Sequence, residues 1–158
     1  MEFYQKYSNS SRIYFGKFNL EKIYFIIYIY YKMTNIIKQN ILGLAFILAV
    51  DNTYLYLNKN FYKPIIDSNE QFNITFAILS WIVIIVGINL LVLSRPDINT
   101  QNSFVFGAYL GFASYALWNC TNYALYPSKW SIKIAIGDTS WGSLVTGTTA
   151  YMMYNYFS

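Results

Sequence analysis

Residues 74–93 form an uninterrupted apolar run, ITFAILSWIVIIVGINLLVL, that contains no charged residue. An α-helix rises about 1.5 Å per residue, so a run of about 20 residues crosses the hydrocarbon layer of a bilayer. In the whole chain of 158 residues, 56% are hydrophobic and only 11% are charged, whereas soluble domains carry about 25% charged residues. The run and the composition together predict an integral membrane protein.

Three further segments have the length of a spanning helix, although polar residues interrupt each of them. The four predicted spans cover about residues 38–57, 73–93, 104–126 and 132–156. A short connection with a proline, a residue typical of turns, separates each span from the next. We therefore predict an all-α, polytopic membrane protein with four transmembrane helices in an antiparallel bundle. Trp130 and several tyrosines lie at predicted span ends, where an interfacial aromatic belt is expected.

The first 32 residues differ from the rest of the chain. Their apolar core, residues 23–31, has nine residues between Lys22 and Lys32, which is too short to cross a bilayer. It also lacks the small-residue cleavage site of a secretory signal. The bias toward Tyr, Ile, Phe, Lys, Asn and Ser resembles translated AT-rich non-coding DNA. We predict an N-terminal extension, residues 1–32, that is spurious, disordered or interfacial, followed by a membrane domain of residues 33–158 that starts at Met33.

The orientation in the membrane depends on this start site, because four spans place both termini on one side. From Met1, that side carries seven Lys and Arg residues against four on the other; from Met33, it carries two against four. The positive-inside rule therefore gives opposite orientations, and the chain as written favours termini in the cytoplasm. The low-GC residue bias fits a virus of eukaryotes, a protist or an AT-rich bacterium, and a viral source would imply a host cell membrane.

Several classes of chemistry are excluded by the composition. The chain has no histidine, which removes His-based triads and His metal sites, and its only cysteine is Cys120. We predict no metal site, no cofactor and no catalytic residue. The net charge of +4 suits loops near anionic lipid headgroups better than a nucleic-acid groove. The predicted partners are therefore the lipid bilayer and not a nucleic acid.

Four polar residues inside the predicted spans lie at one depth. They are Asp51 in the first span, Asn119 and Asn122 in the third, and Asp138 in the fourth. Counted from the span ends at 1.5 Å per residue, each lies roughly 6 to 10 Å inside the same membrane interface. Polar residues scattered at random would not share a depth. We predict that these four residues form one polar layer.

The third and fourth spans can be aligned against each other by centring their turn between Ser128 and Lys129. The level pairs are then Asn119 with Asp138, Tyr115 with Gly142, Gly111 with Thr146, and Gly107 with Ala150. Residues four apart share one helix face, and small residues on that face allow close helix packing. The alignment predicts a tight hairpin in which Asp138 is hydrogen-bonded to Asn119 or Asn122. Trp141 shares a face with Asp138 and is predicted to cover that carboxylate or to donate its indole N–H to it.

A longer pattern runs through the same residues. The third span contains Gly111-x3-Tyr115-x2-Trp118-Asn119-x-Thr121-Asn122-x-Ala124, and Trp130 and Asp138-x2-Trp141-Gly142-x3-Thr146 follow it. Asp51 and Tyr54 in the first span, then Phe61-Tyr62, complete the pattern. It resembles a family of small bacterial and algal membrane proteins of unknown function, which implies four spans and no established activity. The family pattern has Asp at the position of Asn119, so a role that needs a carboxylate there does not transfer to this chain.

The polar layer allows more than one function. Carboxylates inside a membrane are candidates for function, but near the interface Asp–Asn contacts also hold helices together. We expect an uncharacterised multi-pass membrane protein whose polar layer is structural, with Tyr54, Tyr115, Trp118, Thr121 and Trp141 as supporting residues. The alternative is a transporter or channel-like protein that binds a small solute, a proton or a cation in this layer. An enzyme is disfavoured, and a homo-oligomer using the uncommitted Gly87 and Asn89 side of the second span is a further alternative.

Overall fold

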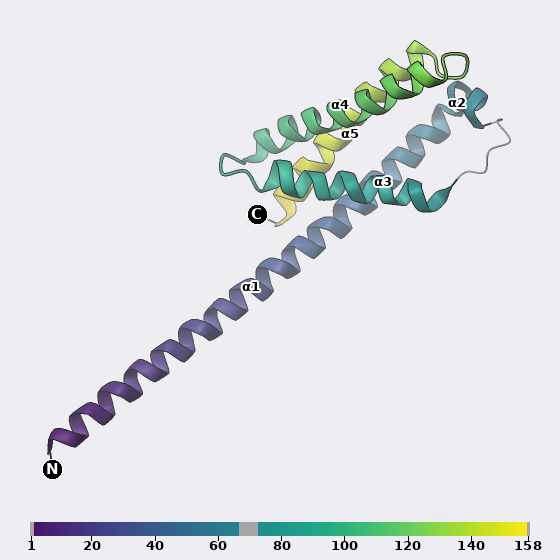
Figure 1. Ribbon diagram of the computed structural model, residues 1–158. Coiled ribbons are helices and arrows are strands. Elements are labelled where there is room, and N and C mark those ends of the chain that lie inside the picture. Colours follow the sequence, from purple (N-terminus) through teal and green to yellow (C-terminus); the bar gives the residue numbers. More distant parts are fainter. Residues whose placement is uncertain (1, 67–72, 158) are drawn as a thin grey trace. The chain divides into compact units, whose positions relative to one another are not determined.

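The computed structural model describes residues 2–66 and 73–157, and every regular element in these residues is a helix (Figure 1). The elements are α1 (Glu2–Leu57), α2 (Lys59–Ile66), α3 (Ile74–Gly87), the π-helical segment η1 (Ile88–Leu93), α4 (Thr100–Leu125) and α5 (Ile132–Phe157). The predicted all-α fold class is therefore confirmed for the described part of the chain. The predicted first connection contains an additional short helix, α2.

The chain divides into two compact parts, residues 1–38 and residues 39–158. The first part is helical from Glu2 onward and belongs to α1. The sequence between Gly16 and Gly43 contains neither glycine nor proline, so nothing in it interrupts a helix. The second part contains the end of α1 and all the other helices. The hypothesis that residues 1–32 are dispensable stays a prediction.

Two helices are long and apolar enough to cross a membrane among the residues that the structure describes. They are Leu20–Leu57, within α1, and Ile74–Leu93, which joins α3 and η1. The first begins well before residue 38, where the first span was predicted to start. The second agrees with the predicted span 73–93. Helices α4 and α5 have 26 residues each, which is enough length for a span, but their polar residues lower their hydropathy.

Side chains at the helix starts explain where α3 and α4 begin. Asn73 accepts a hydrogen bond from the backbone N–H of Phe76 at 3.3 Å, and Asn99 accepts one from Asn102 at 2.9 Å. Such caps satisfy backbone donors that have no partner inside the helix. Helix α4 ends at Leu125, two residues before Pro127. Local sequence therefore places both ends of α4.

Helices α4 and α5 are antiparallel and pack closely along a line of small residues (Figure 1). A Cβ atom added to Gly107 would lie 2.6 Å from the Cβ of Ala150, and one added to Gly111 would lie 2.7 Å from the Cβ of Thr146. A Cβ atom on Gly142 would overlap the ring of Tyr115. These contacts match the pairs that the antiparallel alignment predicts. Beside this hairpin lies an apolar core of Ile47, Ile85, Ile88, Val92, Val145, Ala150 and Met153.

We expect Gly111→Ala to lower the free energy of unfolding by about 1 to 3 kcal/mol, because an added methyl group meets Thr146 and forces α4 and α5 apart. Thermal unfolding in detergent measures this loss. Gly137→Ala is the matched control, since a Cβ atom there meets only the Tyr54 hydroxyl at 3.7 Å. Alanine favours a helix over glycine, so this control should leave stability unchanged or raise it. Equal losses in both variants would contradict the packing explanation.

Candidate functional site: a hydrogen-bonded pair of carboxylates

Asp51 lies on α1 and is almost completely buried, with 8% of its surface exposed. Its Oδ1 accepts a hydrogen bond from the indole N–H of Trp141 at 2.8 Å. Its Oδ2 accepts one from the indole of Trp81 at 2.8 Å and one from the hydroxyl of Tyr115 at 3.4 Å. These donors lie on α5, α3 and α4 respectively. The Asp51 carboxylate is therefore bonded to each of the other three long helices.

Asp138 on α5 is the second buried carboxylate, with 9% of its surface exposed. Its Oδ2 accepts a hydrogen bond from the amide of Asn119 at 2.7 Å, and its Oδ1 accepts one from the hydroxyl of Tyr62 at 3.0 Å. Tyr62 belongs to the short helix α2. Burial raises the pKa of the Tyr62 hydroxyl, and the neighbouring Asp138 carboxylate adds to this effect. The phenol therefore stays protonated and acts as a donor that holds α2 against α5.

Asn119 connects the two carboxylates through Tyr115. Its amide nitrogen donates to Asp138 and also to the backbone carbonyl of Tyr115 at 2.8 Å, while the Tyr115 hydroxyl donates to Asp51. The Asn119 oxygen accepts a hydrogen bond from the indole of Trp130 at 2.9 Å. Asn119 is 1% exposed, and both ends of its amide have partners. An ionised Asp at this position would have no donor for Asp138.

Two predicted contacts differ in the structure. Trp141 donates its N–H to Asp51 and not to Asp138, and its ring stacks on Tyr54 with centroids 4.4 Å apart. Asn122 does not reach either carboxylate, because its amide donates to the carbonyl of Trp118 within α4. The structure thus brings together Asp51, Asn119 and Asp138 but not Asn122.

The other predicted supporting residues divide in the same way. Tyr54 and Tyr115 contact the network. Trp118 is 60% exposed, and the hydroxyl of Thr121 bonds to Leu117 on the exposed side of α4. The exposed side of α4 therefore carries two residues that were expected to line the site.

Three donors were missed or misplaced by the sequence analysis. Trp81 passed as part of a clean apolar run, and Tyr62 was placed in a connection. Trp130 was expected in an interfacial belt, but only 8% of its surface is exposed and its indole donates to Asn119. A buried indole N–H needs an acceptor, which is the signal that could have paired these tryptophans with the polar layer.

A second polar contact joins α1 to η1. Asn89 donates to the side-chain oxygen of Asn40 and to the carbonyl of Ile85. Gly87 faces Leu110 of α4, since an added Cβ atom would lie 3.3 Å from that side chain. The prediction that this side of the second span is uncommitted is therefore wrong. Both residues are used inside the chain.

The carboxylates have neutral neighbours in the described part of the chain. Asp51 accepts hydrogen bonds from two tryptophans and a tyrosine, and Asp138 accepts them from a tyrosine and an asparagine. All five donors are uncharged side chains. No group of three or more His, Cys, Asp or Glu residues that could hold a metal ion occurs among the described residues. An open groove of about 460 Å³ lies elsewhere, lined by Thr100, Gln101, Phe104, Thr148 and Tyr151. It contains none of the residues that bind the carboxylates.

A family model described as "Predicted membrane protein (DUF2177)" matches residues 36–155. The chain belongs to this family. The matched region includes both carboxylates and all their donors, and the family has no known function. The resemblance to a membrane protein family of unknown function is thus confirmed. No curated protein and no solved structure matches the chain.

Proposed function

We propose that this DUF2177 member is a multi-pass membrane protein in which α1, α3–η1, α4 and α5 all cross the bilayer. The distribution of side chains on α4 and α5 supports four spans despite their low hydropathy. Five polar residues of these helices are buried: Ser103, Asn119, Asp138, Thr146 and Thr149 are all at most 9% exposed. Large apolar residues such as Phe112, Leu117, Ile136 and Leu144 are more than half exposed. A hydrocarbon environment favours this arrangement, because it keeps polar side chains away from the lipid and leaves apolar side chains outside. Among the described residues the Thr146 hydroxyl is a buried polar atom without a hydrogen-bond partner.

The role that this geometry supports best for Asp51 and Asp138 is structural. The observation that carries this proposal is the carboxylate of Asp51, which accepts a hydrogen bond from each of the other three long helices. Asp138 joins α5 to α2 through Tyr62 and to α4 through Asn119. Interhelical hydrogen bonds in membranes contribute about 0.6 kcal/mol each on average. Together these bonds fix the positions of the helices relative to one another.

Labelling of single cysteines tests the number of spans. In a Cys120→Ser background, Ser94→Cys lies between η1 and α4, and Ser128→Cys lies between α4 and α5. Both side chains are exposed. Four spans predict that a membrane-impermeant maleimide reaches these two positions from opposite sides of sealed vesicles. Labelling of both positions from the same side would contradict four spans and would support two, because α4 would then fail to cross.

A second candidate function is the binding of a proton, a cation or a small solute at the same carboxylates. It is favoured by the neutral character of all five donors, because buried charges are usually paired with an opposite charge or a metal. From the described residues Asp138 accepts two hydrogen bonds, whereas a carboxylate can accept roughly four. Thermal unfolding separates the two roles. Replacing a carboxylate that has a structural role lowers the midpoint of thermal unfolding. Replacing one that is retained for a ligand does not lower it.

A further inference from the structure

Four lysines lie at one end of the part formed by residues 39–158, and we call them the basic face. They are Lys59 and Lys63 on α2, Lys129 between α4 and α5, and Lys133 at the start of α5. The hydrogen bond from Tyr62 to Asp138 holds α2 beside the first turns of α5, which places both pairs of lysines at this end (Figure 1). All four side chains are exposed. None forms an ion pair within the described residues.

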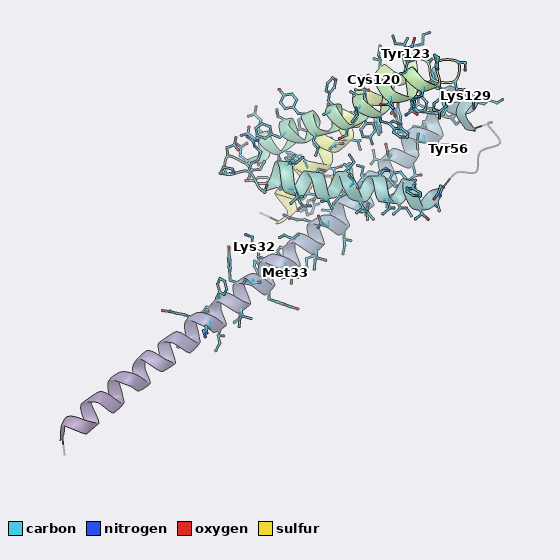
Figure 2. The ribbon with its side chains drawn as sticks, viewed as in Figure 1. Lys32, Met33, Tyr56, Cys120, Tyr123 and Lys129 are labelled. Atoms are coloured by element: carbon cyan, nitrogen blue, oxygen red, sulfur yellow. The ribbon has the colours of Figure 1, made fainter. Side chains whose placement is uncertain are left out.

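Exposed aromatic side chains lie among these lysines. Phe61 on α2 is 58% exposed, and Tyr126 at the end of α4 is 53% exposed. Tyr56 is 69% exposed, and the ammonium of Lys59 lies 5.2 Å from the centre of its ring. Figure 2 labels Tyr56 and Lys129 at this end of the helices. Lysines interleaved with exposed aromatic rings are typical of segments at the level of lipid headgroups.

Helix α2 has the character of a short interfacial helix. It is amphipathic, and Tyr62 faces the interior, where it binds Asp138. Lys59, Phe61 and Lys63 are exposed on the same helix. Because the contact of Tyr62 with Asp138 fixes the orientation of α2, the two lysine charges and the Phe61 ring are exposed to the surroundings. A lipid surface offers partners for both: phosphates for the lysines, and glycerol and acyl groups for the ring.

We propose that the basic face binds the headgroups of anionic phospholipids in the surrounding bilayer. Charge complementarity carries the assignment, because four lysines that form no ion pair with a described residue converge from two segments. The connection from α2 to α3 also contains Asp67 and Glu70, which lie outside the described residues, and the lysines outnumber them two to one. A free phosphate ion would use the lysines but not Phe61 or Tyr126. This inference rests on the proposed membrane arrangement and goes beyond the structural role of the carboxylates.

The test uses the full chain in a neutral detergent, titrated with dioctanoyl phosphatidylglycerol or with dioctanoyl phosphatidylcholine. The dependence of the unfolding midpoint on lipid concentration gives an apparent Kd for each lipid. We expect the wild type to bind phosphatidylglycerol at least about 25-fold more tightly than phosphatidylcholine, since each lysine near an anionic surface contributes about fivefold. The double variant Lys59→Gln/Lys129→Gln should weaken phosphatidylglycerol binding by roughly 25-fold by the same estimate. It should leave phosphatidylcholine binding unchanged.

The matched control is Lys32→Gln/Lys38→Gln, which removes two exposed lysines outside the basic face. Its Kd for phosphatidylglycerol should change by less than about threefold. Equal weakening in both double variants would overturn the proposal in favour of general charge attraction. Competition by soluble glycerol phosphate at the same concentration as the lipid would overturn it in favour of a small-anion site. If a variant does not fold, the lipid titration is repeated with the wild type in 0.5 M salt, which screens the charges of exposed lysines. A preference for phosphatidylglycerol that persists in this salt would overturn the proposal.

This experiment can fail independently of the proposed function. The lipid titration reports on the lysines, whereas cysteine labelling reports on the number of spans and thermal unfolding of Asp51 variants reports on the carboxylate network. If labelling shows four spans but the lipid titration shows no preference, only the proposal that the basic face binds anionic lipid is refuted. A lipid preference with both cysteines labelled from one side would remove the four-span arrangement and leave the basic face as a peripheral lipid contact.

Discussion

Asp51→Asn is expected to lower the midpoint of thermal unfolding in detergent by about 2 to 12 °C. The substitution keeps the shape of the side chain but replaces one acceptor oxygen with an NH₂ group, which donates and does not accept. In one orientation this group meets the indole N–H of Trp141, and in the other it meets the indole N–H of Trp81 and the hydroxyl of Tyr115. At least one buried donor then has no acceptor. Such a donor costs about 1 to 3 kcal/mol, and each kcal/mol lowers the midpoint by roughly 2 to 4 °C in a chain of this size.

Asp97→Asn is the matched control for the loss of a carboxylate. Asp97 lies between η1 and α4, its side chain is half exposed, and it pairs with Arg95 at 3.1 Å. This hydrogen bond holds the pKa of Asp97 below its usual value, so the carboxylate is ionised above that value and its contribution fades as the pH falls through it. Exposed pairs of this kind contribute little to stability. We therefore expect almost no change in the midpoint at pH 7.

An Asp51→Asn variant as stable as the wild type would contradict the structural role. The wild type would then carry a buried charge without a benefit to stability, which is typical of residues retained for function. Ligand binding at Asp51 and Asp138 would become the better explanation, and protons and organic cations would be the first probes. If only the Asp51 variant loses stability, ligand binding would remain an explanation for Asp138 alone. Asp138 accepts fewer hydrogen bonds from the described residues than Asp51 does.

The contacts between α4 and α5 could be predicted because they depend on two neighbouring helices joined by a short turn. Once the turn is placed, the rise of the helix sets which residues lie level, and small residues mark the face of close approach. The Gly111–Thr146 and Asn119–Asp138 contacts match that alignment. The exposed residues of α4, such as Trp118, follow from the same geometry. The sequence pattern nevertheless predicts Trp118 at the site, because the spacing of residues along the chain does not by itself separate the two faces of the helix.

The partners of Asp51 could not be predicted in the same way. Its donors come from α3, α4 and α5, and none of these helices is joined to α1 by a short turn. Periodicity identifies the polar face of a helix but not the neighbour that this face meets. Trp141 illustrates the limit, since it lies one turn from Asp138 on α5 yet donates to Asp51 on α1. Trp81 lies beside Ser80 in a span without charged residues, so only the need of its indole for an acceptor indicated a charged partner.

Asn119→Asp is expected to destabilise the protein by about 3 kcal/mol or more at pH 7. The amide of Asn119 donates to Asp138 at 2.7 Å and to the Tyr115 carbonyl at 2.8 Å. An ionised carboxylate can make neither bond, and it brings a second negative charge into contact with Asp138. Breaking a buried, hydrogen-bonded charge contact typically costs about 3 to 5 kcal/mol. The Trp130 indole keeps an acceptor in this variant, so the loss reports on the contact with Asp138 and not on the contact with Trp130.

The pH dependence of this variant distinguishes charge repulsion from a simple change of shape. A proton on either carboxylate of the pair removes the repulsion and restores a donor between them. The deficit relative to the wild type should therefore shrink as the pH is lowered from 8 to 5 and grow as it is raised. Asn122→Asp is the matched control, since Asn122 lies one turn away on α4 and bonds only within its helix in the described contacts. A deficit that does not change with pH, or one of equal size in Asn122→Asp, would show that Asn119 does not act through Asp138.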